Sequence, residues 1–320
     1  MSEPDIPLLA IVGPTAVGKT ALGIALAQRL GGEIVSADSR QIYRQMDIGT
    51  AKPTPAERAL VPHHLIDIVE PDAPFSLALF QDLAQAAIAA IWVRGRLPIV
   101  VGGTGQYLAA LLQGWQLPRV PPDAAVRADL EREAETTGAL ALHARLAAVD
   151  PDAAATILPT NVRRVIRALE VYTLTGAPIS AQRTMQRPPY AARTLWLALP
   201  PERLYARIDA RVDAMLALGL EAEVRRLVGA GYGWDLPAMS GLGYREFRPL
   251  LAGESTLAAC VERLKFNTHA FARRQKGWFA RLPNVTTLDA GAPDVAALGL
   301  VALGDQRSMR SHQIASPDAP

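Results

Sequence analysis

The stretch Gly13-Pro14-Thr15-Ala16-Val17-Gly18-Lys19-Thr20 fits the pattern G-x-x-x-x-G-K-[ST] and decides the fold. Its glycines let the backbone curl until several N–H groups converge on one anion at a helix N-terminus. Lys19 adds a full positive charge near the terminal phosphate, and Thr20 offers its hydroxyl to Mg²⁺. The stretch therefore predicts a phosphate-binding loop with a strand before it and a helix after it.

Strand and helix patterns alternate around this loop. Residues 7–12 form a short apolar run that ends at Gly13, and residues 19–30 keep helical spacing up to the Gly31-Gly32 pair. Further strands are predicted at 33–37, 64–69, 98–101 and 195–199, with helices at 76–93 and 105–112. The alternation predicts an α/β fold: a P-loop NTPase-like core whose mainly parallel sheet is covered on both faces.

The pattern changes at Leu117, where a proline-rich stretch leads to Asp123 and a helical run as far as Glu135. No convincing strand follows before residue 189, so we predict a helical insertion at 118–193, between a first core segment at 1–117 and a second at 194–290. The second segment should contain a long amphipathic helix from Pro201 and another over 255–281. Residues 291–320 read as a flexible tail.

Composition bounds the class of protein. Half of the 320 residues are apolar, yet no run approaches the length of a membrane span, and the acidic first residues do not resemble a signal peptide. The single cysteine, Cys260, rules out an internal disulfide and fits burial on a helix better than a nucleophilic role. We expect a cytoplasmic monomer that does not associate with membranes.

The net charge of +2 hides two local basic zones. Residues 155–200 carry six arginines against the single acid Glu170, and residues 261–281 carry six Lys/Arg against Glu262. The first 117 residues, in contrast, carry eight basic and ten acidic side chains. Such zones fit a bound polyanion or ordinary solvated helix faces, and charge by itself leaves both open.

The phosphate loop does not say which reaction follows. The strand at 97–101 ends in Gly102-Gly103-Thr104 with no carboxylate, and no Asn-Lys-x-Asp segment occurs, which argues against an ordinary ATPase or GTPase. Asp38 follows another strand, where α/β sheets place ligands, and could accept a proton, while Gln41 could pair with the edge of a base. An Asp-Ser pair is more commonly a cap or a turn.

Eight motifs in one order then carry a family resemblance. After the phosphate loop come DSRQIY, MDIGTAKP, PHHLID, VGGTGQY, RALEVY, GLEAEV and SGLGYREF. Together, over about residues 8 to 280, they resemble the bacterial isopentenyl/dimethylallyl transferase family that acts on tRNA. DSxQ followed by MDIGTAKP is the specific part of the resemblance, because phosphate loops occur in many families.

The resemblance implies a reaction. A dimethylallyl group would pass from dimethylallyl diphosphate to N6 of the adenosine just 3′ of the anticodon, in tRNAs that read codons beginning with U. Asp38 would take the N6 proton, Thr104 would touch the base or the bridging oxygen, and Lys19 with Mg²⁺ would stabilise the departing diphosphate. Because a stacked base cannot reach a buried carbon, the adenine must be extruded.

The resemblance also implies binding residues. Those for the diphosphate are Gly13, Pro14, Thr15, Ala16, Val17, Gly18, Lys19, Thr20 and, less strongly, Arg211, which by spacing alone is as well explained by a surface salt bridge. Thr20 is the implied metal ligand. Those for the tRNA anticodon stem-loop are Asp38, Ser39, Arg40, Gln41, Thr104, Arg127, Arg163, Arg164, Val165, Ile166, Arg167, Ser240, Gly241, Leu242, Gly243, Tyr244 and Arg245.

Several alternatives stay open at this point. A small-molecule kinase would use the same loop for ATP, and an RNA-binding module would use it for a structural anion. Tyr43, Tyr107 and Tyr244 could stack on a base, although helix-facing aromatic residues are more commonly core, and His63 and His64 should finish a strand. Two departures from the family pattern are Gln106 and the segment Asn267-Thr268-His269-Ala270, which puts a ligand role of His269 and Ala270 in doubt.

Overall fold

The computed structural model describes residues 5–182 and 184–304. The chain divides into two compact units. The first, called the core unit here, comprises Met1–Leu112 and Pro188–Pro320, and the second, the helical unit, comprises Gln113–Arg187. Each unit has an apolar cluster of its own.

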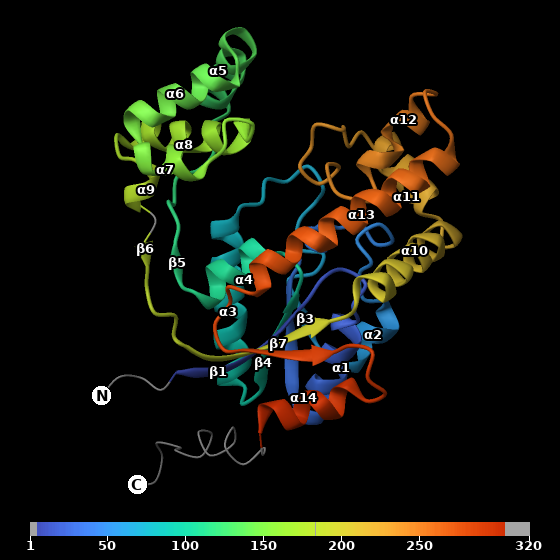
Figure 1. Cartoon of the computed structure of the whole chain (residues 1–320). Helices are drawn as coiled ribbons and strands as arrows, with labels where there is room; N and C mark the ends of the chain where they lie inside the picture. Colours follow the sequence, from blue (N-terminus) through green and yellow to red (C-terminus); the bar gives the residue numbers. More distant parts are fainter. Residues whose placement is uncertain (1–4, 183, 305–320) are drawn as a thin grey trace. The chain divides into compact units, whose positions relative to one another are not determined.

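A six-stranded sheet organises the core unit, and all of its strand pairs are parallel (Figure 1). In spatial order the strands are β3 (His63–His64), β2 (Gly32–Ala37), β4 (Leu97–Gly102), β1 (Ile6–Val12), β7 (Tyr190–Ala198) and β8 (Val285–Asp289). Because β1 is inner and covered on both faces, its residues 8–12 are all buried. The predicted α/β fold with a mainly parallel sheet is confirmed.

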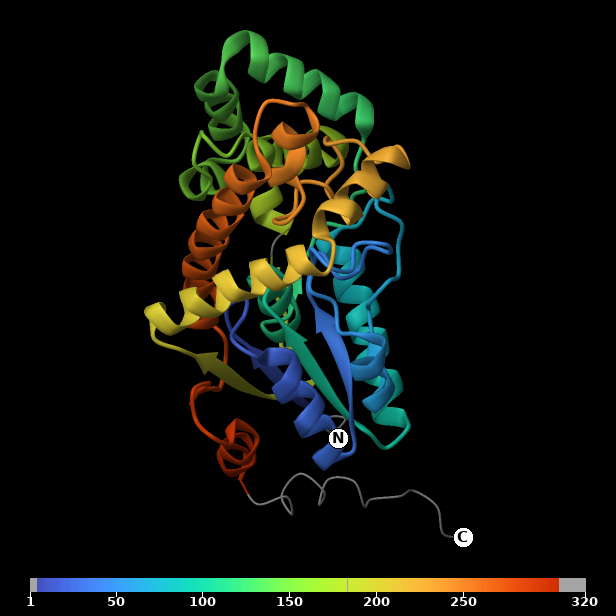
Figure 2. The ribbon, with the colours of Figure 1, turned by 90° about the vertical axis from the view of Figure 1, so that its right-hand side faces the viewer.

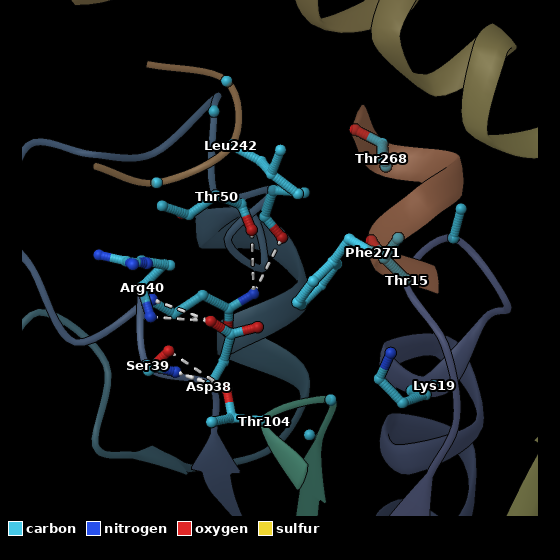
Figure 3. Close-up of a pocket in the computed structure, with 18 of the residues that line it drawn as sticks. Thr15, Lys19, Asp38, Ser39, Arg40, Thr50, Thr104, Leu242, Thr268 and Phe271 are labelled. Carbon is cyan, nitrogen blue, oxygen red and sulfur yellow. Dashed lines mark hydrogen bonds between the residues drawn. The ribbon is translucent and has the colours of Figure 1, made fainter. Parts of the chain in front are cut away.

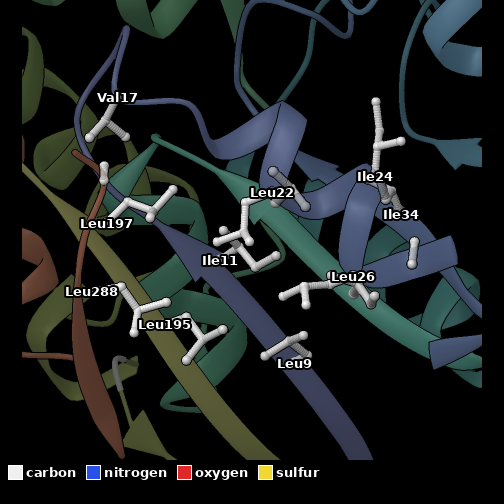
Figure 4. Close-up of a cluster of buried hydrophobic side chains, with 14 of the residues drawn as sticks. Leu9, Ile11, Val17, Leu22, Ile24, Leu26, Ile34, Leu195, Leu197 and Leu288 are labelled. Carbon is white, nitrogen blue, oxygen red and sulfur yellow. The ribbon is translucent and has the colours of Figure 1, made fainter. Parts of the chain in front are cut away.

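Helices cover both faces of this sheet (Figures 1 and 2). α1 (Lys19–Leu30) packs with α14 (Val295–Leu303) on one face, while α3 (Leu77–Val93) and α4 (Gly105–Leu112) lie against each other on the opposite face. Leu26 of α1 reaches the strand residues Leu9 and Ile11 in a cluster that excludes water (Figure 4). Burial of each such side chain stabilises the fold by roughly 1.5–3 kcal/mol.

A second group of helices stands on the carboxyl side of the strands. It consists of α10 (Pro201–Ala217), α11 (Leu220–Gly229), the short 3₁₀ helix η1 (Arg245–Phe247), α12 (Arg248–Leu251) and α13 (Leu257–Phe279), whereas α2 (Pro55–Leu60) lies against α1. An apolar cluster centred on Met46, Tyr244 and Phe247 binds α11 and α13 to the loop that follows β2. The predicted helices from Pro201 and over 255–281 correspond to α10 and α13.

The helical unit holds five helices among its described residues and a two-stranded antiparallel ribbon. The helices are α5 (Ala124–Thr137), α6 (Ala139–Val149), α7 (Pro151–Thr156), α8 (Val162–Thr175) and α9 (Ile179–Gln182), and the ribbon pairs β5 (Trp115–Gln116) with β6 (Thr184–Met185). Asp123 caps α5 by accepting from the Val126 amide at 2.9 Å. The unit begins and ends a few residues before the predicted 118–193.

Three sequence expectations need correction. The strand predicted at 64–69 stops at His64, because Leu65 and Asp67 adopt positive φ angles of 62° and 58° that no strand accommodates. Strand β7 begins at Tyr190, inside the predicted insertion. The predicted tail at 291–320 contains α14, while residues 305–320 lie outside the described residues.

None of the helices among residues 5–182 and 184–304 combines the length and apolar character that crossing a membrane requires.

Candidate functional site

The carboxyl ends of three adjacent strands bring the sequence motifs of the core unit together. The order β2-β4-β1 places Asp38, Thr104 and the phosphate loop side by side along one edge of the sheet. Ligands of open α/β sheets bind at this edge. All three motifs line one cavity of about 300 Å³ (Figure 3).

The phosphate loop has the backbone that its glycines predict. Gly13 and Gly18 have φ angles of 153° and 105°, and Ala16 also lies in the left-handed region at 63°. A Cβ on Gly13 would lie 2.7 Å from the Leu197 carbonyl oxygen, so a larger residue would displace the loop from β7. The Lys19 ammonium donates to the Pro14 carbonyl at 2.8 Å. The loop is therefore folded back on itself around its lysine.

The cavity is electropositive on the side of this loop. Burial, and then the nearby Arg211 guanidinium, lower the pKa of Lys19 to about 8, against the opposing attraction of Asp38. Burial also lowers the pKa of Arg211, which Asp38 again opposes. Arg211 donates to the Thr15 hydroxyl at 3.4 Å, so it belongs to this cavity and not to a surface salt bridge. Two desolvated cations with one carboxylate across from them are suited to a polyanion such as diphosphate.

Asp38 uses its two oxygens differently. Oδ1 accepts from the backbone amides of Arg40 at 2.9 Å and Gln41 at 3.4 Å, which closes the turn after β2. The second oxygen points into the cavity (Figure 3). The turn expected of an Asp-Ser pair is thus present, and the same carboxylate still offers an acceptor to a ligand.

Thr104 and Arg40 hold this turn in place. The Ser39 amide donates to the Thr104 hydroxyl oxygen at 3.0 Å, which joins the ends of β2 and β4. The Arg40 guanidinium donates to the carbonyl of Pro237, to that of Ala238 at 3.5 Å and to the Ser240 hydroxyl at 3.4 Å. Arg40 therefore fastens the turn to the segment that contains the predicted residues Ser240 to Arg245.

Gln41 is fixed as a hydrogen-bond acceptor toward the cavity. Its Nε2 donates to the carbonyls of Thr50 at 3.4 Å and Ala51 at 3.2 Å, and its Oε1 accepts from the Ser36 hydroxyl at 3.2 Å. Because Nε2 already donates to the protein, the predicted pairing of Gln41 with a base edge stays a prediction in which its oxygen is the accepting atom. Only Oε1 can still accept from a ligand.

The loop 46–52 that supplies these carbonyls is held by a buried carboxylate. Glu223 of α11 accepts from the amides of Asp47, Ile48 and Gly49 at 2.9–3.0 Å and from the Tyr244 hydroxyl at 2.8 Å. The Lys52 ammonium adds bonds to Asp47 at 2.6 Å and Asp67 at 2.5 Å. The MDIGTAKP segment is thereby a rigid wall of the cavity.

The three tyrosines considered for base stacking are core residues. Tyr244 is completely buried, Tyr43 is 3% exposed, and Tyr107 stacks on Phe80 with ring centroids 3.9 Å apart. Burial raises the pKa of Tyr107 and of Tyr244. The tRNA contact predicted for Tyr244 is therefore wrong for its side chain. Among its neighbours, Ser240, Gly241, Leu242, Gly243 and Arg245 line the cavity.

In the helical unit, the predicted RNA residues divide into two groups. Val165 and Ile166 are buried in the apolar cluster, and Arg127 and Arg167 both bind the Glu170 carboxylate, which has no exposed side-chain surface. These arginines hold the pKa of Glu170 below its usual range. Arg163 and Arg164 are exposed at the start of α8. The side-chain contacts predicted for Val165 and Ile166 are wrong, and Arg163 and Arg164 stay candidates.

Residues of α13 that the sequence motifs do not include, Gln275 and Phe271 among them, complete the cavity. Gln275, 4% exposed, accepts from the Thr15 amide at 3.0 Å and donates to the Gly103 carbonyl at 2.8 Å, which couples the phosphate loop to β4. Phe271 points into the cavity one helical turn away (Figure 3). In the sequence, only the presence of a glutamine among the core positions of an amphipathic helix could have indicated a role for Gln275.

The remaining candidates have structural roles. His64 binds Glu33 at 2.8 Å and His63 binds the Val61 carbonyl at 2.9 Å, as expected for residues that finish a strand. His269 binds Asp209 at 2.8 Å and stacks on Tyr205, so it joins α13 to α10. Cys260 is free and buried. Among the described residues, no group of three His, Cys, Asp or Glu could hold a metal ion.

Comparison with known proteins adds independent evidence. The IPP transferase family model matches residues 41–282, and the isopentenyl transferase model matches residues 6–62. A tRNA dimethylallyltransferase of Roseiflexus sp. (strain RS-1) is 70% identical over 91% of this chain and 95% of its own length. One of Chloroflexus aggregans is 62% identical over 91% of this chain and 98% of its own.

Two solved structures are similar throughout the chain. The tRNA isopentenylpyrophosphate transferase of Bacillus halodurans has a TM-score of 0.69 and 42% identity, covering 96% of this chain and 99% of its own. A eukaryotic dimethylallyltransferase acting on tRNA has a TM-score of 0.79 and 30% identity, covering 98% of this chain and 82% of its own.

Proposed function

The chain belongs to the IPP transferase family and is a prenyltransferase that modifies tRNA, and we propose that its substrate atom is N6 of the adenosine just 3′ of the anticodon. The donor is dimethylallyl diphosphate, and the acceptor adenosine belongs to tRNAs that read codons beginning with U. The observation that carries the proposal is one cavity that joins a phosphate loop, the desolvated cations Lys19 and Arg211 and the carboxylate of Asp38. The loop and the cations can stabilise a departing diphosphate at one end of the cavity, and the carboxylate can accept a proton at the other.

The nucleophile needs help from the protein. An adenine N6 is a poor nucleophile, because its lone pair is delocalised into the ring. As the N6–C1 bond forms, the inward oxygen of Asp38 takes one N6 proton, and Gln41 Oε1 is positioned to accept from the other. Thr104, already bound to Ser39, lies between Asp38 and the phosphate loop and would contact the base or the bridging oxygen.

The leaving group is stabilised from the opposite side. When the C1–O bond breaks, its electron pair moves onto the diphosphate, and the charge is met by the loop amides, Lys19 and Arg211. Lys19 at present donates to the Pro14 carbonyl, so a diphosphate would replace this bond with its own oxygens. A loop that holds ATP in kinases would hold a leaving group here.

We further propose that Mg²⁺ accompanies the diphosphate. Thr20 lines the cavity, and its hydroxyl would hold the ion. When bound, the ion would neutralise charge that develops on the diphosphate.

The tRNA anticodon stem-loop would supply an extruded adenine to this cavity. Ser240, Gly241, Leu242 and Gly243 line the cavity, and Arg163 and Arg164 of the helical unit are exposed cations that could contact phosphates. The cytoplasmic monomer expected from the sequence stays a prediction.

A transfer assay tests the proposal. Purified protein with Mg²⁺, dimethylallyl diphosphate labelled in its allylic carbons and unmodified tRNA should give labelled tRNA, and nuclease digestion should find the label on the adenosine 3′ of the anticodon. Label at another nucleoside would refute the proposed position. Consumption of ATP with a small acceptor and no RNA would instead support the kinase alternative.

A further inference from the structure

One face of α13 forms a wall of the cavity. Leu264, Thr268, Phe271 and Gln275 all line it and follow one another at intervals of four, three and four residues, which places them along one side of the helix. Gln275 anchors this wall to the phosphate loop. The position of Phe271 relative to that loop is therefore fixed by a buried hydrogen-bonded neighbour on the same helix.

Phe271 differs from Phe279, another aromatic residue of the same helix. Phe279 is completely buried, whereas Phe271 is half-buried and its ring points into the cavity, toward the space that separates Asp38 from Lys19 (Figure 3). In the proposed reaction this space must contain the allylic carbon, because N6 approaches from Asp38 and the diphosphate leaves toward Lys19.

The electrostatics of the cavity create a specific problem for that carbon. As the C1–O bond stretches ahead of N6–C1 bond formation, positive charge develops over the allylic carbons. Lys19 and Arg211, which stabilise the diphosphate, repel this charge. Asp38 is one source of negative potential, and the face of an aromatic ring, whose quadrupole is negative, is another.

We propose that Phe271 is a catalytic residue whose ring face stabilises the positive charge on the dimethylallyl group during transfer. This inference rests on the proposed function. In the step, N6 forms its bond to C1, the C1–O pair passes to the diphosphate, and one N6 proton passes to Asp38, while Phe271 forms no bond. An attraction of this kind predicts a loss of about 2- to 30-fold in the transfer rate without the ring, which corresponds to about 0.5–2 kcal/mol.

The test replaces Phe271 with phenylalanines that carry one, two or three ring fluorines, which weaken the negative face with little change in volume. We expect the single-turnover transfer rate to fall with each added fluorine, while the affinity for dimethylallyl diphosphate and the melting temperature change little. Phe271→Leu, which keeps an apolar wall, should be at least as slow as the most fluorinated enzyme.

The same series at Phe266 is the matched control, since this ring lies on α13 but is 63% exposed, and it should leave the rate unchanged. A rate that is flat across the series at Phe271, or a Phe271→Leu enzyme as fast as the wild type, would overturn the inference. The wild type is measured alongside: if it forms no prenylated tRNA, the proposed function fails, whereas an active wild type with a flat series rejects only the role of the ring.

Discussion

At the scale of the residue, the site depends on polar groups that already have one partner and keep a second function for the ligand. Asp38 closes a turn with one oxygen and directs the other into the cavity. Gln41 has both amide hydrogens on loop carbonyls, which leaves its oxygen to accept. Because each group is already oriented before substrate binds, little reorganisation is needed during the reaction.

Asp38→Asn tests the proton acceptor without removing the turn. Asparagine keeps an Oδ1 that can accept from the Arg40 and Gln41 amides, but it cannot take a proton at neutral pH. The transfer rate should fall about 10²- to 10⁴-fold, the usual contribution of a positioned general base, as measured by single-turnover transfer to tRNA. Affinity for dimethylallyl diphosphate should be retained, because Lys19 and Arg211 remain. A rate near that of the wild type would exclude Asp38 as the base.

Lys19 predicts a pH dependence of donor binding. In the free protein its pKa is lowered to about 8, so the ammonium loses its proton as pH rises through that value. A bound diphosphate favours the charged form, so binding must then take up a proton. The dissociation constant of dimethylallyl diphosphate should be level below pH 8 and rise above it, approaching about tenfold per pH unit. Lys19→Ala should bind weakly without this rise, and a parallel rise in the variant would assign it to another group.

At the scale of the element, the sequence predicts what local patterns determine and misses what neighbours determine. The phosphate loop, α1, α3 and α4 follow from apolar spacing, glycines and caps, and all are present. Strand β7 is longer than its apolar run predicts, because residues 190–193 pair with β1 but not with β8 and so alternate buried with exposed side chains. No continuous apolar run marks such a half-covered strand.

Tertiary partners explain the other gaps in the same way. The sequence does not identify α14 as a core helix, because its apolar residues are recognised as core only when they pack against α1. Gly299 allows a close approach to Leu26 there. Of the site, the phosphate loop, Asp38 and Thr104 could be predicted, since each follows a strand. Gln275 and Phe271 could not, because their roles depend on α13 returning to the loop from about 260 residues further along the chain.

Glu223 links an element to the site, and Glu223→Ala should lower the free energy of unfolding by roughly 3 kcal/mol or more. The substitution leaves three partly buried amides and the buried Tyr244 hydroxyl without this acceptor, and an unsatisfied buried group costs roughly 1–3 kcal/mol. Denaturant unfolding measures the decrease. The control is Glu221→Ala on the same helix, where the partly exposed pair with Arg225 should contribute less than about 1 kcal/mol. Equal effects of the two substitutions would contradict a clamping role.

At the scale of the whole molecule, the distribution of charge says more than its sum. Of the basic side chains in the helical unit, Arg127 and Arg167 neutralise buried Glu170 and are thereby part of the fold. Arg163 and Arg164 instead stand in the first turn of α8, which has no acidic residue and no side-chain cap. Cations at a helix N-terminus oppose the helix dipole. Their placement disfavours the helix locally, which points to a function in binding an anion.

The double variant Arg163→Ala, Arg164→Ala separates that function from folding. Removing two cations from the start of α8 should leave the melting temperature of the protein unchanged or raise it slightly, since the dipole interaction amounts to about 0.3–1 kcal/mol per charge. Affinity for tRNA should fall, and the slope of log K against log salt should become shallower by roughly 0.7–0.9 for each phosphate that the variant no longer neutralises. Arg132→Ala, an exposed arginine paired with Asp129 on α5, is the control and should change neither slope nor affinity. If the double variant instead melts at a lower temperature and keeps the salt slope of the wild type, α8 needs these side chains for its fold and tRNA does not bind them.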